Sequence, residues 1–306
     1  MKACFVGTGS IGKRHIRNLR EICREREIDL EIHVFRSSKD TLADDIARLV
    51  DKQIFDYREL RDTYDAIFIT NPTSMHYQTL QDIGAYSNCF YIEKPLFETK
   101  QKDLSALNLS DKNTYYIACP LRYTNVMNEV RQVIAKEKAF SARAICSTYL
   151  PDWRQGVDYR KVYSANKEMG GGVCLDLIHE WDYLTHLFGF PDKVIKICGK
   201  YSDLEINSED LAVYIALYKD MLVEVHLDYF GREPKRLLEV YTDQSSWTFD
   251  ILHETVMKNG VLIKDMKEDG NQKYIRELNF FLDVCFSEET NTNPISYALR
   301  VMEIAE

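Results

Sequence analysis

The sequence predicts an α/β domain with a doubly wound parallel sheet, followed by an α+β domain with a large, mostly antiparallel open sheet. Three observations support this prediction. The chain has 306 residues, which is more than one ordinary core organises. Up to residue 119, short apolar runs alternate with helical patterns. From Pro120 onward, longer runs with period-two alternation follow one another. We therefore expect domains at residues 1–119 and 120–306.

Each expected element of the first domain has a local signal. Short apolar runs bounded by turn residues predict buried strands, and the amphipathic stretches between them predict helices. We expect strands at 2–6, 31–35, 66–69, 90–92 and 115–118, and helices at 13–26, 41–52, 75–85 and around residue 104. Strands that alternate with helices form a parallel sheet, which binds its ligands at the carboxyl ends of the strands.

The second domain is expected to contain longer strands and few helices. We expect strands at 140–149, 193–200, 211–218, 222–230, 236–242 and 246–251, and helices at 125–138 and 173–188. Gly189 and Pro191 end the second of these helices. We expect the active site between the two domains.

Composition and charge exclude several classes of function. Lys and Arg number 39 and Asp and Glu number 48, so the formal net charge of −9 argues against nucleic acid as the main partner. No stretch approaches the roughly 20 apolar residues of a membrane span, and the chain start leaves no room for a signal peptide. The eight cysteines form no C-x-x-C pair, which is typical of buried thiols in a reducing cytoplasm. No H-E-x-x-H or similar spacing predicts a metal.

A glycine-rich segment follows the first expected strand and opens the first expected helix. G-x-G-x-x-G in this context is typical of dinucleotide binding, because the glycines let the backbone approach a pyrophosphate and the helix start offers free N–H groups. The alternative is an ordinary glycine-rich turn. The expected cofactor-binding residues here are Gly7, Gly9, Ser10, Ile11 and Gly12.

The end of the second strand distinguishes the two nicotinamide cofactors. An NAD site usually has an acidic residue there, whereas this chain has Arg36-Ser37-Ser38-Lys39. A guanidinium can pair with a 2′-phosphate through two hydrogen bonds, and the serine hydroxyls can add donors. The sequence therefore favours NADP over NAD. The alternative is a solvated Arg36 in a site that accepts both cofactors.

Two further segments lie at carboxyl ends of expected strands. Thr70, Asn71, Pro72 and His76 could line the ribose and the nicotinamide, and the alternative is a capped helix start. Glu93-Lys94-Pro95 follows the run Cys89–Ile92 and would deliver a lysine into the cleft, so we also expect Glu93 and Lys94 to contribute to cofactor binding. If a nicotinamide lies there, Lys94 is placed for proton transfer beside the hydride.

The segment Gly170–Asp182 predicts a second set of reactive groups. Three glycines let the backbone pass close to another group, and a helix then begins. Asp176 and His179 are three residues apart and would share a helix face. A carboxylate beside an imidazole fixes its tautomer and raises its basicity, as a general base requires. The alternative is a buried helix whose histidine is merely hydrogen-bonded in the core.

Taken together, these motifs resemble the glucose–fructose oxidoreductase / inositol dehydrogenase / MocA family. The resemblance spans nearly the whole chain and rests on Gly7–Gly12 with His15, Asn71-Pro72 with His76, Glu93-Lys94-Pro95, Arg122, Gly170–Asp182 and Ala298–Val301. It implies that Lys94 and an aspartate–histidine pair carry proton transfer. His179 matches directly, whereas Asp176 lies three residues before the histidine in place of the usual four.

Residues 149–165 resemble a branch of the family linked to bacterial cell-surface sugar synthesis. Aromatic faces suit a sugar ring, and arginine suits a carboxylate or phosphate attached to it. The alternative is an interdomain connection packed by aromatic side chains. The expected substrate-binding residues are Arg122, Trp153, Arg154, Tyr159, Tyr163, Asp176 and His179.

The resulting hypothesis is reversible hydride transfer between a nicotinamide and a secondary alcohol carbon of a sugar or nucleotide-sugar-like substrate. His179 is the first choice for the base, and Lys94 either moves a proton or stays charged to stabilise an alkoxide. One alternative is an epimerase or lyase with no net redox change. Another is a dinucleotide-binding regulator that catalyses nothing.

The second sheet also predicts self-association. One face is expected to lie under the helix at 173–188, and the other to carry residues such as Tyr214, Ala216 and Tyr218. An exposed apolar face of this kind usually meets another subunit. We expect a homodimer or homotetramer in the cytoplasm.

Overall fold

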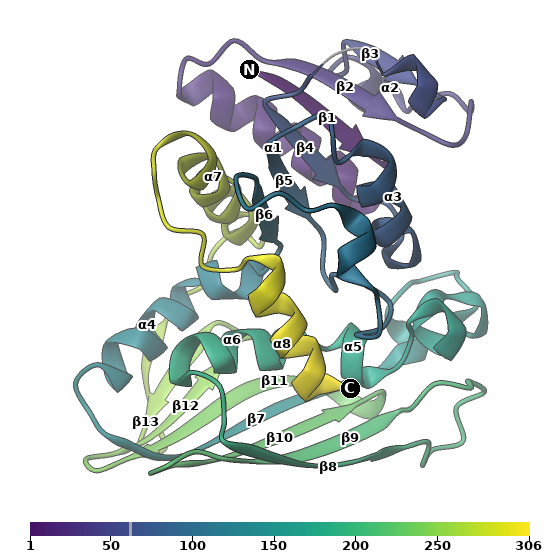
Figure 1. The fold of residues 1–306 in the computed structure, drawn as a ribbon. Helices are drawn as coiled ribbons and strands as arrows, with labels where there is room; N and C mark the ends of the chain where they lie inside the picture. Colours follow the sequence, from purple (N-terminus) through teal and green to yellow (C-terminus); the bar gives the residue numbers. More distant parts are fainter. Residues whose placement is uncertain (61–62) are drawn as a thin grey trace. The chain divides into compact units, whose positions relative to one another are not determined.

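The chain forms two compact units (Figure 1). The computed structural model describes residues 1–60 and 63–306. The first unit contains residues 1–119 and 273–300, and the second contains residues 120–272 and 301–306. The sequence-based division had assigned 273–300 to the second half. This segment belongs with the first unit because the ring of Phe281 packs against Phe68 and Tyr91, and the carboxylate of Glu277 accepts a hydrogen bond of 2.9 Å from the Tyr91 hydroxyl.

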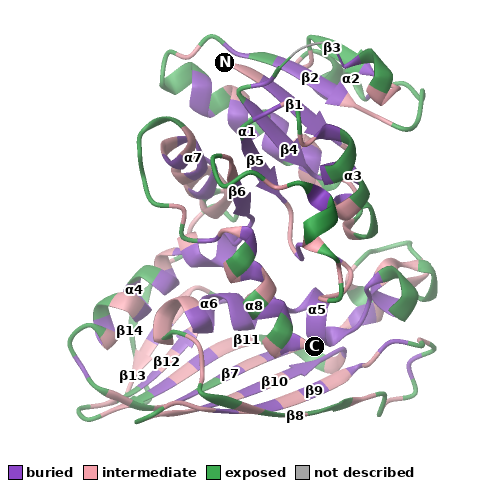
Figure 2. Ribbon diagram, viewed as in Figure 1, coloured by how far each residue is buried: buried purple, intermediate pink, exposed green. Residues whose placement is uncertain are grey.

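The first unit is built on a six-stranded sheet with the order β3-β2-β1-β4-β5-β6, in which every pair is parallel. Its strands are β1 (Lys2–Val6), β2 (Glu31–Phe35), β3 (Lys52–Ile54), β4 (Ala66–Ile69), β5 (Cys89–Ile92) and β6 (Thr114–Ile117). The strands β1, β4 and β5 are almost wholly buried (Figure 2). The strand order reverses beside β1, which makes the carboxyl ends of β1 and β4 the ligand-binding edge of such a sheet.

Helices lie on both sides of this sheet (Figure 1), as the sequence predicts for a doubly wound fold. They are α1 (Ser10–Glu25), α2 (Asp44–Ala47), α3 (His76–Ile83), α7 (Gln272–Phe286) and the first part of α8 (Ile295–Ala305), with 3₁₀ turns η1 (Tyr57–Glu59), η2 (Thr73–Met75) and η3 (Leu104–Leu107). On α1, the fully buried Ile16, Leu19 and Ile22 recur at helical spacing and face the sheet. The helix expected at 41–52 is wrong, because only the four residues of α2 are helical and β3 follows.

The second unit contains an eight-stranded sheet with the order β14-β13-β12-β11-β7-β10-β9-β8. All its pairs are antiparallel except β10 with β7, which confirms the predicted fold class. Its strands are β7 (Ala139–Tyr149), β8 (Lys193–Gly199), β9 (Leu211–Leu217), β10 (Leu222–Asp228), β11 (Phe230–Thr242), β12 (Ser246–Asp250), β13 (Thr255–Lys258) and β14 (Val261–Asp265).

Helices lie on one face of this second sheet (Figure 1). They are α4 (Asn125–Ile134), α5 (Val173–Asp176), α6 (His179–Phe188) and the end of α8, and the 3₁₀ turns are η4 (Pro120–Tyr123), η5 (Leu150–Asp152), η6 (Tyr159–Lys161), η7 (Tyr163–Ala165) and η8 (Lys167–Met169). None of the helices in the described ranges is both long enough and apolar enough to cross a membrane.

Two expectations about this unit are wrong. The single helix expected at 173–188 is broken at Leu177, whose ψ of 29° departs from helical geometry, so that α5 and α6 are separate helices. Tyr214 and Ala216 are fully buried on the covered face, where the Tyr214 hydroxyl donates to Ala305 O at 2.7 Å. Val213 and Ile215 lie on the opposite face of β9.

Candidate cofactor and substrate sites

The three glycines of the first loop have different structural roles. Gly7 has a φ of +97°, and a Cβ there would lie 2.8 Å from the backbone of Asn71. A Cβ at Gly12 would lie 2.5 Å from Gly7 O and 2.7 Å from Thr70 Oγ1. At Gly9, by contrast, no atom of the described residues lies within 4 Å of the added Cβ. Packing therefore requires Gly7 and Gly12, and Gly9 leaves the backbone open to a ligand.

The start of α1 fits the pyrophosphate of a dinucleotide. The helix begins at Ser10, and its cap residue Gly9 has no side chain that could occupy the free N–H groups of Ser10 and Ile11. The sixteen residues of α1 add their peptide dipoles, which makes this end favourable for negative charge. The residues that the sequence predicts for phosphate binding therefore form an open, electropositive helix start.

The residues after β4 hold the glycine loop in place. The Thr70 hydroxyl donates to Gly7 O at 2.8 Å, and the Asn71 amide donates to Thr79 Oγ1 at 2.8 Å. Pro72 caps the turn η2 without a side-chain hydrogen bond. These contacts bring the carboxyl ends of β1 and β4 together, where the sequence places the cofactor.

His76 lies beneath this edge. Its side chain is fully buried, with Nδ1 3.0 Å from Leu96 O and Nε2 3.0 Å from Asn71 O. Burial lowers the pKa of the His76 imidazole. The ring joins the loop after β4 to the loop after β5, so it reaches a bound ligand only through the backbone of these two loops.

The loop after β2 presents charges of both signs. Arg36 Nη1 donates to Gln53 Oε1 and to Asp40 O, each at 2.8 Å. Within the described residues, its Nε and Nη2 atoms make no hydrogen bond. The Ser38 hydroxyl donates to the Asp40 carboxylate, and Ser37 is exposed. One edge of the guanidinium therefore remains for a ligand, with a carboxylate in the same loop.

Lys94 leaves the sheet at the carboxyl end of β5. The preceding Glu93 donates its N–H to Ile69 O at 3.0 Å, and its Oε1 lies 2.6 Å from Nε2 of the buried His15. Lys94 itself is half-buried, and its bond to Pro95 is cis. From the sequence, His15 contributes only to the family resemblance, and its contact with Glu93, which is 78 residues away, was not predicted.

In the second unit, Asp176 is the centre of a buried cluster of hydroxyl groups. Its carboxylate accepts hydrogen bonds from Tyr163, from Ser164 Oγ at 2.6 Å and from the Tyr229 hydroxyl at 3.0 Å. Burial and the nearby Asp176 charge raise the pKa of the Tyr163 hydroxyl. Asp176 ends α5 and His179 begins α6, so they do not share one helix face as expected. Sequence reasoning missed Tyr229.

The glycine triplet serves the packing of this cluster. A Cβ at Gly171 would lie 2.2 Å from Tyr163 O and 2.6 Å from Ser164 O. Gly170 and Gly172 both have positive φ values, of 79° and 112°. The close approach that the sequence predicts is therefore made to the chain's own segment of residues 163–166.

Arg122 is committed to an internal ion pair. Its side chain is 2% exposed and forms two hydrogen bonds to Asp182, from Nε at 2.8 Å and from Nη2 at 2.6 Å. Its Nη1 lies 3.3 Å from His186 Nδ1. Burial, with the charges of Arg122 and Arg131, lowers the pKa of His186 to about 3. The guanidinium that the sequence predicts as a substrate ligand is therefore buried and paired with Asp182.

The other expected substrate residues surround the Asp176 cluster. The Trp153 indole N–H donates to Thr148 Oγ1, and its ring meets Tyr229 edge-on at 5.3 Å. The exposed Arg154 lies over the ring of Tyr163 at 5.7 Å. The cavity under this loop measures about 10 Å³, which holds at most about one water. Arg154 is exposed, whereas Trp153, Tyr159 and Tyr163 are half-buried.

Tyr159 anchors the same loop, because its hydroxyl accepts the N–H of Glu205 at 3.2 Å. No group of three or more His, Cys, Asp or Glu side chains in the described part of the chain could hold a metal ion.

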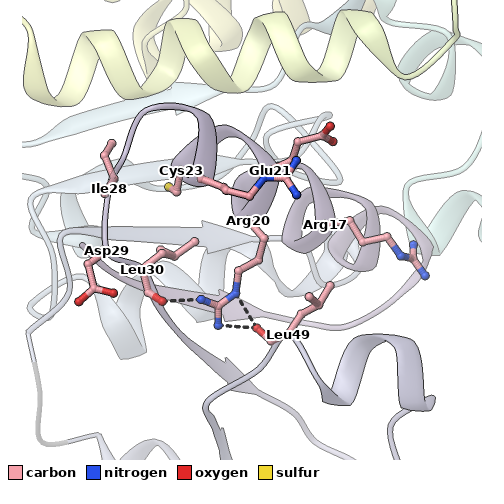
Figure 3. Close-up of a pocket in the computed structure, with 9 residues that line it drawn as sticks. Arg17, Arg20, Glu21, Cys23, Ile28, Asp29, Leu30 and Leu49 are labelled. Carbon is pink, nitrogen blue, oxygen red and sulfur yellow. Dashed lines mark hydrogen bonds between the residues drawn. The ribbon is translucent and has the colours of Figure 1, made fainter.

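A larger hollow of about 640 Å³ lies along α1 (Figure 3). The Arg20 guanidinium donates to Leu49 O at 3.0 and 2.7 Å and also to Leu30 O. It further pairs with Asp51 at 2.5 Å, and Arg17 pairs with Asp45. These arginines join α1 to the segments beside it, and we assign no ligand to the hollow.

The fold and these residues are typical of a two-domain protein with a dinucleotide-binding domain. The first unit has the parallel sheet order and open glycine loop of a dinucleotide-binding domain, and the second has a large open sheet with a buried hydroxyl cluster. No family model matches the chain.

Oxidoreductases share this fold. Over its full length the chain matches UDP-N-acetylglucosamine 3-dehydrogenase from Acidithiobacillus ferrooxidans, with a TM-score of 0.76, 18% identity and 95% of that chain covered. It also matches levoglucosan dehydrogenase in complex with NADH and levoglucosan, with a TM-score of 0.81, 15% identity and 95% of that chain covered. These matches support the resemblance to the glucose–fructose oxidoreductase / inositol dehydrogenase / MocA family at the level of the fold.

A sequence relative agrees with this class. An uncharacterised oxidoreductase, YrbE of Bacillus subtilis strain 168, is 23% identical over 227 residues, which is 71% of this chain. The match spans 63% of the relative's length. The three relatives are all named as dehydrogenases or oxidoreductases, in agreement with the predicted enzyme class.

Proposed function

We propose that the chain is a nicotinamide-dependent oxidoreductase acting on a secondary alcohol carbon of a sugar or nucleotide-sugar-like substrate. The observation that carries the proposal is the open Gly9 at the start of α1, beside the point where the strand order reverses. The residues present fit a dinucleotide, since none of the described side chains fills the cradle of free N–H groups. When bound, the nicotinamide supplies or accepts a hydride. We assign cofactor binding to residues 1–119 and substrate binding to residues 120–306.

The proposed proton carriers are Lys94 and His179. Lys94 lies just beyond the buried strand β5. Glu93, the residue between the strand and Lys94, is anchored by two hydrogen bonds. His179 is half-buried at the first position of α6. In oxidation, we propose that a base takes the proton of the substrate hydroxyl and that a cation stabilises the oxygen's developing charge. We propose that Asp176 acts indirectly, by holding the hydroxyls of Tyr163 and Ser164 in place.

We further propose that NADP is preferred to NAD. The free edge of Arg36 can form two parallel hydrogen bonds with a 2′-phosphate, each charge-assisted bond contributing about 1.5–3 kcal/mol. Because two such bonds together contribute about 3–6 kcal/mol, Arg36→Ala is expected to weaken NADPH binding about 10²- to 10⁴-fold and to leave NADH binding unchanged. The control is Asp40→Asn, which keeps the loop and removes its carboxylate. Equal losses for both cofactors in Arg36→Ala would remove the proposed preference.

For the substrate, the exposed arginine and the aromatic residues of the 149–165 loop support a sugar with an attached anionic group. Arg154 presents its guanidinium to solvent beside Tyr163. Two probe substrates follow from the relatives, namely UDP-N-acetylglucosamine and levoglucosan. Of these, the first carries a diphosphate that a guanidinium can bind. We expect Arg154→Ala to raise KM for the nucleotide sugar more than for levoglucosan.

The uncovered face of the second sheet supports association with a second copy of the chain. Ile195 and Ile197 on β8 are 48% and 63% exposed, and they pair in register with Ile215 and Val213 on β9. On the neighbouring strand β10, Glu224 lies in register with Ile215, and it forms an ion pair with Arg143 on β7. This pair places opposite charges on the same face. A face with apolar and complementary charged parts suits a two-fold symmetric contact.

We propose a homodimer or homotetramer through this face. Ile197→Glu should convert the oligomer to monomers in analytical ultracentrifugation. Val261→Glu, which changes an equally exposed side chain on β14, should leave the assembly intact. A monomeric wild-type chain would contradict the proposal, as would an unchanged assembly in Ile197→Glu.

The activity itself is tested by following nicotinamide absorbance with both probe substrates and both cofactors. Lys94→Ala should retain cofactor binding and lose turnover by roughly 10²- to 10⁴-fold, the usual contribution of a positioned proton carrier. Near-normal turnover in this variant would remove Lys94 from the chemistry. Turnover without net change in the reduced cofactor would indicate epimerisation or bond cleavage in place of oxidation.

A further inference from the structure

A buried histidine of the cofactor-binding helix contacts the residue before Lys94. His15 lies on α1, one turn beyond Gly12, and its side chain is fully buried. Its Nε2 lies 2.6 Å from Oε1 of Glu93. A carboxylate can only accept a hydrogen bond, so the imidazole donates its Nε2–H. The helix that begins at the proposed pyrophosphate site is therefore tied to the strand end that carries Lys94.

Apart from Nε2, the His15 imidazole makes no hydrogen bond to the described residues. Its Nδ1 is buried, and none of the described residues offers it a hydrogen-bond partner. The ring is held edge-on by Tyr91 and Tyr274, with centroid distances of 5.0 and 6.0 Å. Buried polar atoms are almost always paired, and an unpaired one is costly. A leucine would fill the same space without this cost, so the hydrogen bond to Glu93 is the feature that distinguishes histidine here.

Glu93 is held at two points. Its backbone N–H donates to Ile69 O at 3.0 Å, and its side chain accepts from His15. The second contact fixes the side chain and, with it, the direction in which the chain leaves β5. Reacting groups that are misplaced by about 1 Å can lose roughly 100-fold in rate. An anchor directly before a proton carrier is therefore expected to affect the chemical step.

We propose that His15 is a positioning residue for Lys94, acting through Glu93. The proposal rests on the proposed function in that Lys94 is taken to move a proton. Its effect is on the placement of the Lys94 amine, so removal of the imidazole should change the chemistry of that amine before it changes the affinity for cofactor or substrate.

The test compares His15→Leu with His15→Gln, whose amide can still donate to Glu93, and with Ile16→Ala. Ile16 is the next residue of α1 and is also fully buried, so its truncation loosens the helix without touching Glu93. The primary readout is reductive methylation of lysines in the full-length protein, with Lys94 followed by peptide mass spectrometry. The second readout is the separation of kcat from KM with UDP-N-acetylglucosamine and levoglucosan.

In His15→Leu we expect the labelling rate of Lys94 to change at least about threefold relative to Lys100, and kcat to fall about 10- to 100-fold with KM within about threefold. His15→Gln should restore both values. Ile16→Ala should lower thermal stability and leave both close to those of the wild type. If His15→Leu fails to fold, the same contact is tested from its other side by comparing Glu93→Gln with Glu93→Leu. The amide oxygen of glutamine can still accept the hydrogen bond from His15, whereas leucine cannot.

The outcomes separate the two proposals. Wild-type labelling and kcat in His15→Leu would overturn the positioning role. A loss that Ile16→Ala shares and His15→Gln does not restore would also overturn it, as a purely structural effect. If the wild-type chain turns over neither probe but the labelling of Lys94 still depends on His15, the positioning role stands and the proposed activity fails.

Discussion

Replacing two glycines of the first loop should separate packing from ligand binding. At Gly12, an added Cβ would lie 2.5 Å from Gly7 O and 2.7 Å from Thr70 Oγ1, closer than folded proteins allow. Such overpacking costs about 1–3 kcal/mol, and the better helix propensity of alanine returns about 0.5–1 kcal/mol. Gly12→Ala should therefore lower the free energy of unfolding by about 1–2 kcal/mol.

At Gly9 the same substitution meets open space, and its φ of −67° suits alanine. A weaker helix cap and a less flexible unfolded chain roughly offset each other, so the free energy of unfolding should stay within about 0.5 kcal/mol. The methyl group would, however, stand where the backbone must approach a pyrophosphate. We expect Gly9→Ala to weaken cofactor binding at least tenfold.

The assays are urea unfolding followed by fluorescence, and NADPH titration of the same samples. Unfolding of Gly12→Ala at the wild-type urea concentration would contradict the packing role of Gly12. NADPH binding by Gly9→Ala as tight as that of the wild type would show that the loop is not the phosphate site.

Three further predictions concern the second unit. Arg122→Ala should lower the free energy of unfolding by about 3–5 kcal/mol in urea melts, because it leaves the carboxylate of Asp182 buried without its partner. The folded-state pKa of His186 is about 3, below the unfolded value of about 6.5, so its contribution to stability is present above pH 6.5 and lost as the pH falls toward 3. His186→Asn should flatten the stability curve of acid titrations by up to about 1.4 kcal/mol per pH unit in that window, and an unchanged slope would contradict the assignment. Asp176→Asn should lower kcat and the melting temperature together, because a single amide oxygen cannot accept hydrogen bonds from all the hydroxyls that the wild-type carboxylate binds. Loss of kcat alone, with full stability, would instead favour a direct role of Asp176 in proton transfer.

Local patterns predicted the fold class well, because five of the six strands in the parallel sheet are short and mostly buried runs. Strand β3 was missed because only Ile54 of its three residues is buried, which leaves no apolar run to detect. The face of β9 was assigned wrongly for a related reason. Both faces of that strand carry apolar residues, and a shift of one residue exchanges the faces.

Those parts of the candidate site that a single continuous segment supplies could be predicted from the sequence. Gly7–Gly12 and the position of Lys94 follow from neighbouring residues. The partners of Asp176 lie up to 53 residues away, and the partner of Arg122 lies 60 residues away. Pairing over such separations depends on tertiary packing, which local patterns do not contain.

The central claim is tested most directly by calorimetric titration of the purified chain, freed of carried-over cofactor, with NADPH and separately with NADH. The account predicts saturable binding of both cofactors, with NADPH clearly preferred. Preference for NADH would contradict the role given to Arg36 and leave the fold and the glycine loop intact. If neither cofactor bound, the proposed oxidoreductase would be contradicted as a whole.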